Sequence, residues 1–185
     1  MLYVRPTMRM IRGMSKPRPE RQVPPAKLAT DIPDAGLYDE DFVAWIERQA
    51  ALLRSGTLTA LDRANLAEEL EDMGKAKRQE LRSRLEALLT HLLKYQFQPD
   101  MRTGSWLGTI GEQRHRIEDV VEESPSLRPL LAELLEDAKI YKRAVQKAAL
   151  ETGLPASTFP PTNPYGGQAL DGRFWPGPGP HPDLD

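Results

Sequence analysis

The chain has 185 residues, of which 39% are hydrophobic and 28% charged, and its net charge is −2. Length and composition are typical of a folded domain with a sizeable core. Cysteine is absent, which excludes disulfides, thiolate metal sites and cysteine nucleophiles. No apolar run approaches the roughly 18 residues of a membrane span, and no secretory signal is visible. We therefore expect a cytoplasmic protein without a membrane segment.

Proline marks the ends of the helical region. Six of the 17 prolines lie in residues 1–33 and eight lie from Pro155 onward. Since proline inside a helix costs about 3 kcal/mol, this distribution predicts a helical core with non-helical ends. We expect a disordered leader over residues 1–35, a helical bundle domain over 36–153, a docking tail over 154–176 and a disordered end over 177–185.

The leader is basic, whereas the rest of the chain is acidic. Residues 1–30 carry seven Lys or Arg against Glu20 alone, and the remainder carries 18 basic and 26 acidic residues. A basic segment can contact nucleic acid or another acidic surface. A disordered leader is the simpler interpretation, and nucleic-acid association through it stays open as an alternative.

Three helices are predicted in the first half of the core. The first covers residues 39–53, with acidic residues at its start and Gly56 at its end. The second covers residues 60–73, and Gly74 is expected to break or kink the chain after it. The third and longest covers residues 75–98, where the apolar residues at helical spacing are Leu81, Leu85, Leu88, Leu92 and Tyr95.

Two more helices complete the prediction. Ser105 is a suitable N-cap for a helix that ends at Ser124 and contains Gly108 and Gly111. A last helix begins between Leu127 and Pro129 and runs to Thr152, with apolar residues alternating by four and three. The fold class is therefore all-α: a five-helix bundle with a long central helix and an extended C-terminal tail packed on it. The expected tail anchors are Phe159, Tyr165, Leu170, Phe174 and Trp175.

Several segments resemble a known family. In chain order they are 65–74 (NLAEELEDMG), 91–99 (HLLKYQFQP), Ser105-Trp106, Gln113-Arg114, 124–127 (SPSL), Asn163-Pro164-Tyr165 and Leu170-Asp171. Together they resemble a bacterial family catalogued as a domain of unknown function, number twenty-nine, from Leu37 to about Pro176. That family often has a cysteine at the position of Asn163. The resemblance implies a helical fold and no established activity.

A polar cluster is predicted where three helices meet. If the third and fourth helices are antiparallel about Arg102, Gln98 faces Trp106, Lys94 faces Ile110, and His91 faces Gln113 and Arg114. A turn near Ser126 brings Tyr141 opposite Gly111, where the ring would need the space. The cluster has two interpretations: a satisfied core network, or a site where His91 acts as acid–base or binds a small anion. Its members are His91, Lys94, Gln98, Gln113, Arg114 and Tyr141.

Two charged stretches of the central region have weaker functional interpretations. The acidic stripe consists of Asn65, Glu68, Glu69 and Asp72, but no Glu-x-x-His pair accompanies it as in bundle metal sites. With a turn at Gly74, His91 would be roughly 18 Å away along the helix. We therefore expect surface ion pairs and no metal or other cofactor. The basic run Lys75, Lys77, Arg78, Arg82 and Arg84 lacks an aromatic platform, so a nucleic-acid partner is not expected.

The sequence contains no nucleophile paired with a base and no phosphate-binding loop. It favours a non-enzymatic module that binds a protein partner or self-associates through long amphipathic helices. The alternatives that stay open are an enzyme or small-ligand binder using the His91 cluster, and nucleic-acid association through the leader.

Overall fold

A computed structural model describes residues 36–179 of the chain. The predicted leader, with its nucleic-acid alternative, lies outside the described residues, as does the segment 180–185. Within residues 36–179 no helix is both long and apolar enough to cross a lipid bilayer.

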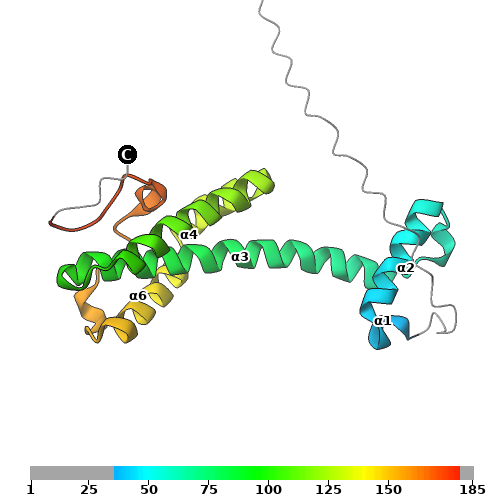
Figure 1. Ribbon diagram of the computed structural model, residues 1–185, viewed down its shortest axis with the longest axis horizontal. Coiled ribbons are helices and arrows are strands. Elements are labelled where there is room, and N and C mark those ends of the chain that lie inside the picture. The colour runs from blue at the N-terminus through cyan, green and yellow to red at the C-terminus, as the bar shows by residue number, and fades with distance from the viewer. Residues whose placement is uncertain (1–35, 180–185) are drawn as a thin grey trace, which may run out of the picture. The chain divides into compact units, whose positions relative to one another are not determined.

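The described residues form helices and no strands, so the all-α prediction is confirmed. Five short 3₁₀ turns connect or follow them. The α-helices are α1 (Leu37–Glu40), α2 (Phe42–Ser55), α3 (Arg63–Phe97), α4 (Gly104–Glu123), α5 (Arg128–Leu135) and α6 (Ala138–Thr152) (Figure 1).

Internal contacts divide the described residues into two compact units, residues 36–62 and residues 63–179. The sequence predicts one helical domain over 36–153, whereas α1 and α2 form the described part of a unit of their own. The Nε1 of buried Trp45 donates to the Asp62 carboxylate at 3.3 Å, and Asp62 N donates to the Gln49 side chain at 2.9 Å. These bonds fold the chain after α2 back onto that helix, which closes the small unit locally.

Of the break or kink expected at Gly74, the break is wrong. α3 is one helix of 35 residues that passes through this position. Glycine costs a helix only about 1 kcal/mol relative to alanine, and strong helix formers surround it on both sides. The second and third predicted helices are therefore one. The helix predicted to begin at Ala60 begins at Arg63 instead, and Ala60 is the last residue of the 3₁₀ turn Leu58–Ala60.

The last predicted helix is two helices. α5 ends at Leu135 and α6 begins at Ala138, and the Asp137 side chain accepts a hydrogen bond of 2.7 Å from Lys139 N. Aspartate favours such an N-cap over a helix interior. The sustained apolar seam concealed this local signal. The described residues contain six helices rather than five, because this split offsets the merger at Gly74 and the short α1 is separate from α2.

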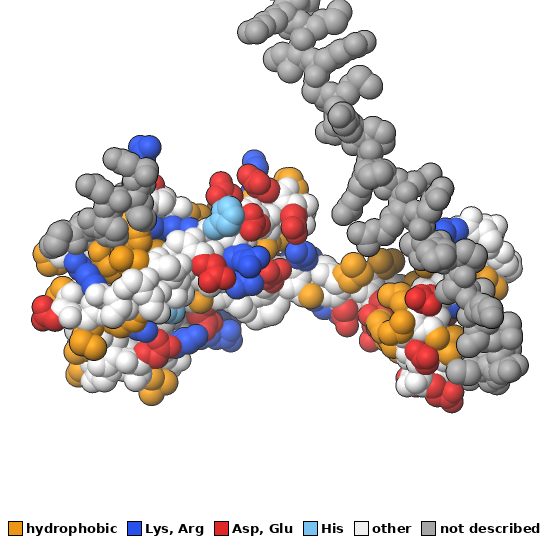
Figure 2. Space-filling model, in the orientation of Figure 1, with side chains coloured by type: hydrophobic (Ala, Val, Ile, Leu, Met, Phe, Trp, Pro, Cys, Tyr) orange, Lys and Arg blue, Asp and Glu red, His pale blue; other side chains and the backbone are white. Residues whose placement is uncertain are grey.

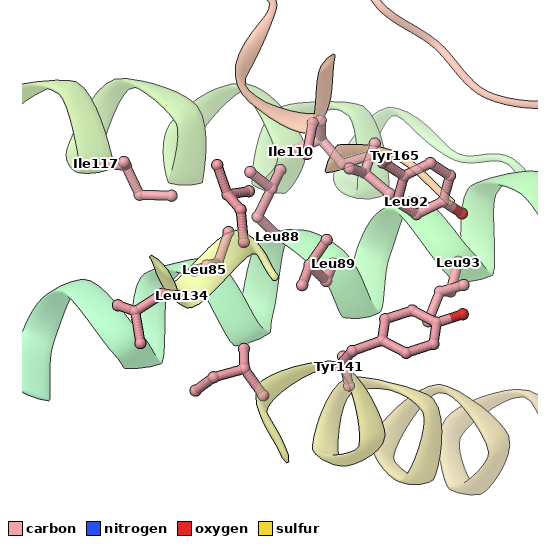
Figure 3. Close-up of a cluster of buried hydrophobic side chains, with 14 of the residues drawn as sticks. Leu85, Leu88, Leu89, Leu92, Leu93, Ile110, Ile117, Leu134, Tyr141 and Tyr165 are labelled. Carbon is pink, nitrogen blue, oxygen red and sulfur yellow. The ribbon is translucent and has the colours of Figure 1, made fainter. Parts of the chain in front are cut away.

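The core lies along the C-terminal half of α3. Figure 3 shows Leu88 and Leu92 near Ile110 of α4, and Leu93 near Tyr141 of α6. α4 and α6 both lie beside this half of α3 (Figure 1). The predicted apolar face is confirmed, because all five of its residues are buried: Leu81, Leu85, Leu88, Leu92 and Tyr95.

The C-terminal tail packs on the bundle as predicted. Phe159, Tyr165 and Trp175 are buried, and Leu170 and Phe174 are partly buried against the core. The Trp175 ring lies 5.3 Å from that of Tyr95. The ordered tail also extends further than expected, because Pro178 O accepts a hydrogen bond of 2.9 Å from Arg102.

Candidate functional site

Lys94 lies near the end of α3 and is almost fully buried. Its Nζ lies 2.6 Å from the Glu151 carboxylate of α6 and 4.6 Å from the centre of the Trp106 ring. A buried ammonium requires a partner of opposite charge, and Glu151 supplies it. Burial would raise the Glu151 pKa, but the hydrogen bond and charge of Lys94 outweigh that effect and hold this pKa below its usual value.

His91 lies one turn earlier on α3 and is half-buried. Its Nδ1 lies 2.9 Å from Ala87 O, so Nδ1 donates and the lone pair of the neutral ring is on Nε2. Burial lowers the His91 pKa, and the charge of Lys94 adds to this although the Ala87 bond opposes it. His91 is therefore held as a neutral imidazole near the Lys94–Glu151 pair.

The other predicted cluster residues make their contacts elsewhere. The Gln98 side chain donates to Thr152 O of α6 at 3.0 Å, and Tyr141 donates to Pro160 O of the tail at 2.9 Å. Gln113 is buried on α4 and its Oε1 has no hydrogen-bond partner. The Trp106 ring, predicted to face Gln98, lies 4.6 Å from Lys94 Nζ, which was predicted to face Ile110. Burial raises the pKa of Tyr141 to about 12, so its hydroxyl stays protonated.

Arg114 holds the tail. Its guanidinium donates to Ala169 O at 2.9 Å, to Gly172 O at 3.4 Å and to Phe174 O at 2.6 Å. It also lies 5.1 Å from the centre of the Trp175 ring. Burial lowers its pKa, and Asp171 partly offsets this. The five donors of arginine suit several carbonyls at once, so this side chain fixes the tail on α4.

Arg102 is a second clamp at the α3–α4 turn. It donates through Nε to Tyr95 O at 2.9 Å, and its guanidinium lies 4.1 Å from the centre of the Tyr95 ring. Gly177, at φ 92°, lies so near that an added Cβ would be 3.0 Å from the guanidinium. Two arginines, Arg102 and Arg114, thus bind the last described part of the tail.

The explanation offered for Gly111 is wrong. A Cβ there would meet no atom within 4 Å, so the Tyr141 ring does not require the space. Nothing in the structure explains Gly108 or Gly111. Gly111 instead lines an open groove of about 610 Å³ beside Arg114, between α4, α5 and the tail. The groove also contains side chains of both charge signs, so it does not select one ligand class.

The acidic stripe and the basic run both lie on α3. Asp72 pairs with Lys75 at 2.7 Å, Lys77 pairs with Glu123 of α4 at 3.0 Å, and Arg84 lies 3.5 Å from Glu80. Figure 2 shows red and blue side chains interspersed on this face. Within residues 36–179 no group of three or more acidic or histidine side chains is placed to hold a metal ion.

The first half of α3 is less buried than the second. None of residues 63–80, all of which are described, is buried. Leu66, Leu70 and Met73 share one face of the helix, and we call them the α3 stripe. Leu70 and Met73 are each 66% exposed. Leu66 is half-buried. By helical spacing this face continues that of Leu81, Leu85 and Leu88, so the apolar face of α3 is buried from Leu81 onward and exposed at Leu70 and Met73.

The comparisons with known proteins agree with this architecture. Residues 37–175 match the family described as Domain of unknown function DUF29. The chain belongs to the DUF29 family. The matched region begins at α1 and ends at Trp175, so the tail segment held by Arg114 is part of the DUF29 domain, whereas Gly177 and Pro178 beside Arg102 lie beyond the match. Comparisons with curated proteins and with solved structures gave no match.

Sequence reasoning missed two features of this DUF29 protein. Glu151 was not singled out, although a lysine so near the core needs a carboxylate partner. The exposed first half of α3 was also missed. A turn at Gly74 would have placed Leu66 to Met73 against the bundle, so their exposure was not expected. The first buried residue of α3 is Leu81, and this shows that the preceding half of the helix is exposed.

His91 gives a prediction for pH. Its pKa is lower folded than unfolded, so the unfolded chain binds more protons near the usual value of about 6.5. Its contribution to stability is therefore lost as pH falls through that value toward the folded pKa. Urea unfolding at pH 7.5 and pH 5.5 should show a smaller loss for His91→Gln than for wild type. An equal loss in both proteins would show that His91 does not titrate in this way.

Proposed function

We propose that this DUF29 protein is a non-enzymatic interaction module whose α3 stripe binds a helix of a protein partner. The observation that supports it most is the uncovered first half of α3. Single exposed hydrophobic residues are ordinary, but exposed Leu70 and Met73 share one face with half-buried Leu66, at spacings of four and three. Figure 2 shows hydrophobic side chains reaching the surface along α3 outside the bundle.

Helix stability gives a second reason. A helix of about 15 residues is marginal in water unless packing covers its apolar face. Residues 63–80 have no buried side chain in the structure, and their glycine lowers helix propensity further. A partner that covers Leu66, Leu70 and Met73 would stabilise this segment as α4 and α6 stabilise the segment after it.

The stripe also defines the chemistry of its partner. Its residues repeat at i, i+4 and i+7, which matches the anchor spacing of helix-to-helix recognition. Acidic residues precede Gly74 and basic residues follow it on the flanks. The complementary surface is therefore an amphipathic helix with apolar residues at the same spacing and an opposite charge gradient.

Site-specific photocrosslinking tests the proposal. A photoreactive phenylalanine analogue at Leu70 should form an adduct with a protein helix in cells of the source organism, identified by mass spectrometry. The control is the same analogue at Leu150 of α6, which is 86% exposed and lies outside the stripe. Equal adducts from both positions, or none from Leu70, would contradict the proposal.

The second candidate function is the binding of a small anion at His91. It is favoured by the positive charges of Lys94 and Lys147, which act on the His91 ring. The neutral Nε2 carries a lone pair, so an anion would bind His91 only with Nε2 protonated and donating. Phosphate, sulfate and acetate are suitable probes in a thermal-shift assay. An anion that stabilises wild type more than His91→Ala would support this candidate, and equal shifts would remove it.

A further inference from the structure

We propose that the partner of the α3 stripe is a second copy of this chain, bound through an antiparallel pairing of residues 63–80. This inference rests on the proposed function and adds the identity of the partner and the direction of the helices. It is carried by the order of residues along the open face of α3, which brings opposite charges together only when the two helices are antiparallel.

The apolar layers fix the register. In an antiparallel pair with Leu70 of one copy against Met73 of the other, Leu66 lies against Lys77. The lysine stem can cover the leucine while its ammonium stays in water. All three stripe residues of both copies then lie within the interface. A shift of one heptad in one direction would pair Leu66 with Leu70 and Met73 with Arg63, but would leave residues 74–80 without a partner segment of α3. A shift in the other direction would pair no two stripe residues.

The outer layers fix the direction. In the same register Arg63 of one copy lies against Glu80 of the other, so opposite charges close both ends of the interface. A parallel pairing would instead put Arg63 against Arg63, Lys77 against Lys77 and Glu80 against Glu80. Like charges in contact oppose such a pairing. The charge order therefore favours antiparallel helices.

Two further features fit the antiparallel pair. Ala67 and Gly74 lie beside the stripe and come opposite each other, and small residues let two helices approach closely. Within each bundle, α4 reaches as far as Lys77, where Glu123 binds that lysine at 3.0 Å. A second copy would thus cover the face of α3 where α4 stops covering it.

Analytical ultracentrifugation tests the association. Wild type should show a concentration-dependent monomer–dimer equilibrium, and Leu70→Glu should stay monomeric at the same concentrations. Leu150→Glu should dimerise as wild type does, since this exposed residue lies on α6. Circular dichroism should show all three proteins folded. A monomeric wild type, or equal dimerisation of Leu70→Glu, would overturn the inference.

The absence of native cysteine allows the direction to be tested with single probes. In a mixture of Leu70→Cys and Met73→Cys proteins, a short bismaleimide should join one variant to the other more than either to itself. Arg63→Glu or Glu80→Arg alone should weaken dimerisation about tenfold, and the two together should restore it. Preferential self-linking of each variant, or no restoration, would overturn the antiparallel pair.

The photocrosslink at Leu70 separates the two proposals. Adducts with a second copy support both. Adducts only with a different protein would overturn the second copy as partner and leave the interaction module standing, whereas no adduct would contradict both.

Discussion

Arg114→Ala should lower the free energy of unfolding by about 3–4 kcal/mol and release the C-terminal tail. The substitution removes a buried cation and leaves the carbonyls of Ala169, Gly172 and Phe174 without their donor. Hydrogen bonds from charged groups contribute about 1.5–3 kcal/mol, and unsatisfied buried acceptors add a further cost. Urea unfolding measures the loss of stability. Limited trypsin digestion at exposed Arg173 measures release of the tail.

Two controls make this result specific. Arg116→Ala removes an arginine from the same helix whose side chain is 53% exposed, and it should change stability by less than about 0.5 kcal/mol. Arg114→Lys keeps the charge but cannot reach several carbonyls from one planar group, so it should restore only part of the loss. A tail that stays protected from trypsin in Arg114→Ala would contradict the role of this clamp.

Leu88→Ala should cost about 2–5 kcal/mol, because the side chain is fully buried between α3 and its neighbours. Figure 3 places it among the core leucines facing α4. The lost transfer free energy and the cavity that remains both contribute to this cost. The midpoint of urea unfolding at a fixed, dilute protein concentration is the appropriate measurement.

The same helix supplies matched controls for that substitution. Leu70→Ala makes the same chemical change at a position that is 66% exposed, and Arg82→Ala removes a side chain outside the apolar face. Each should lie within about 0.5 kcal/mol of wild type. A Leu70→Ala loss as large as that of Leu88→Ala in dilute protein would show that the chain itself covers the α3 stripe.

The sequence predicts this fold well where the apolar pattern is long and regular. The face from Leu81 to Tyr95 predicts the core correctly because one helical period is maintained over four turns. The pattern fails at Gly74 and at Asp137, where one residue decides. A break is expected at Gly74, but the strong helix formers around it keep the helix continuous. Asp137 is expected inside a helix, but its side chain caps the start of α6 by accepting from Lys139 N.

The candidate site is predicted less completely because its partners come from distant segments. The antiparallel arrangement of α3 and α4 is correct, yet it does not show where long side chains point. Arg114 donates to the tail, and Lys94 pairs with Glu151 across α6. Backbone carbonyls of an irregular tail have no sequence signature, so the partners of Arg114 could not be identified from residue types.

Hydrogen–deuterium exchange of residues 63–80 against protein concentration tests the α3 stripe most directly. Uncovered helix should exchange fast in dilute protein, and its amides should become protected as concentration rises, while Leu81 to Phe97 stays protected throughout. Leu70→Glu should abolish the concentration dependence. Slow exchange of residues 63–80 at every concentration, unchanged by Leu70→Glu, would contradict the assignment of this face as a binding surface.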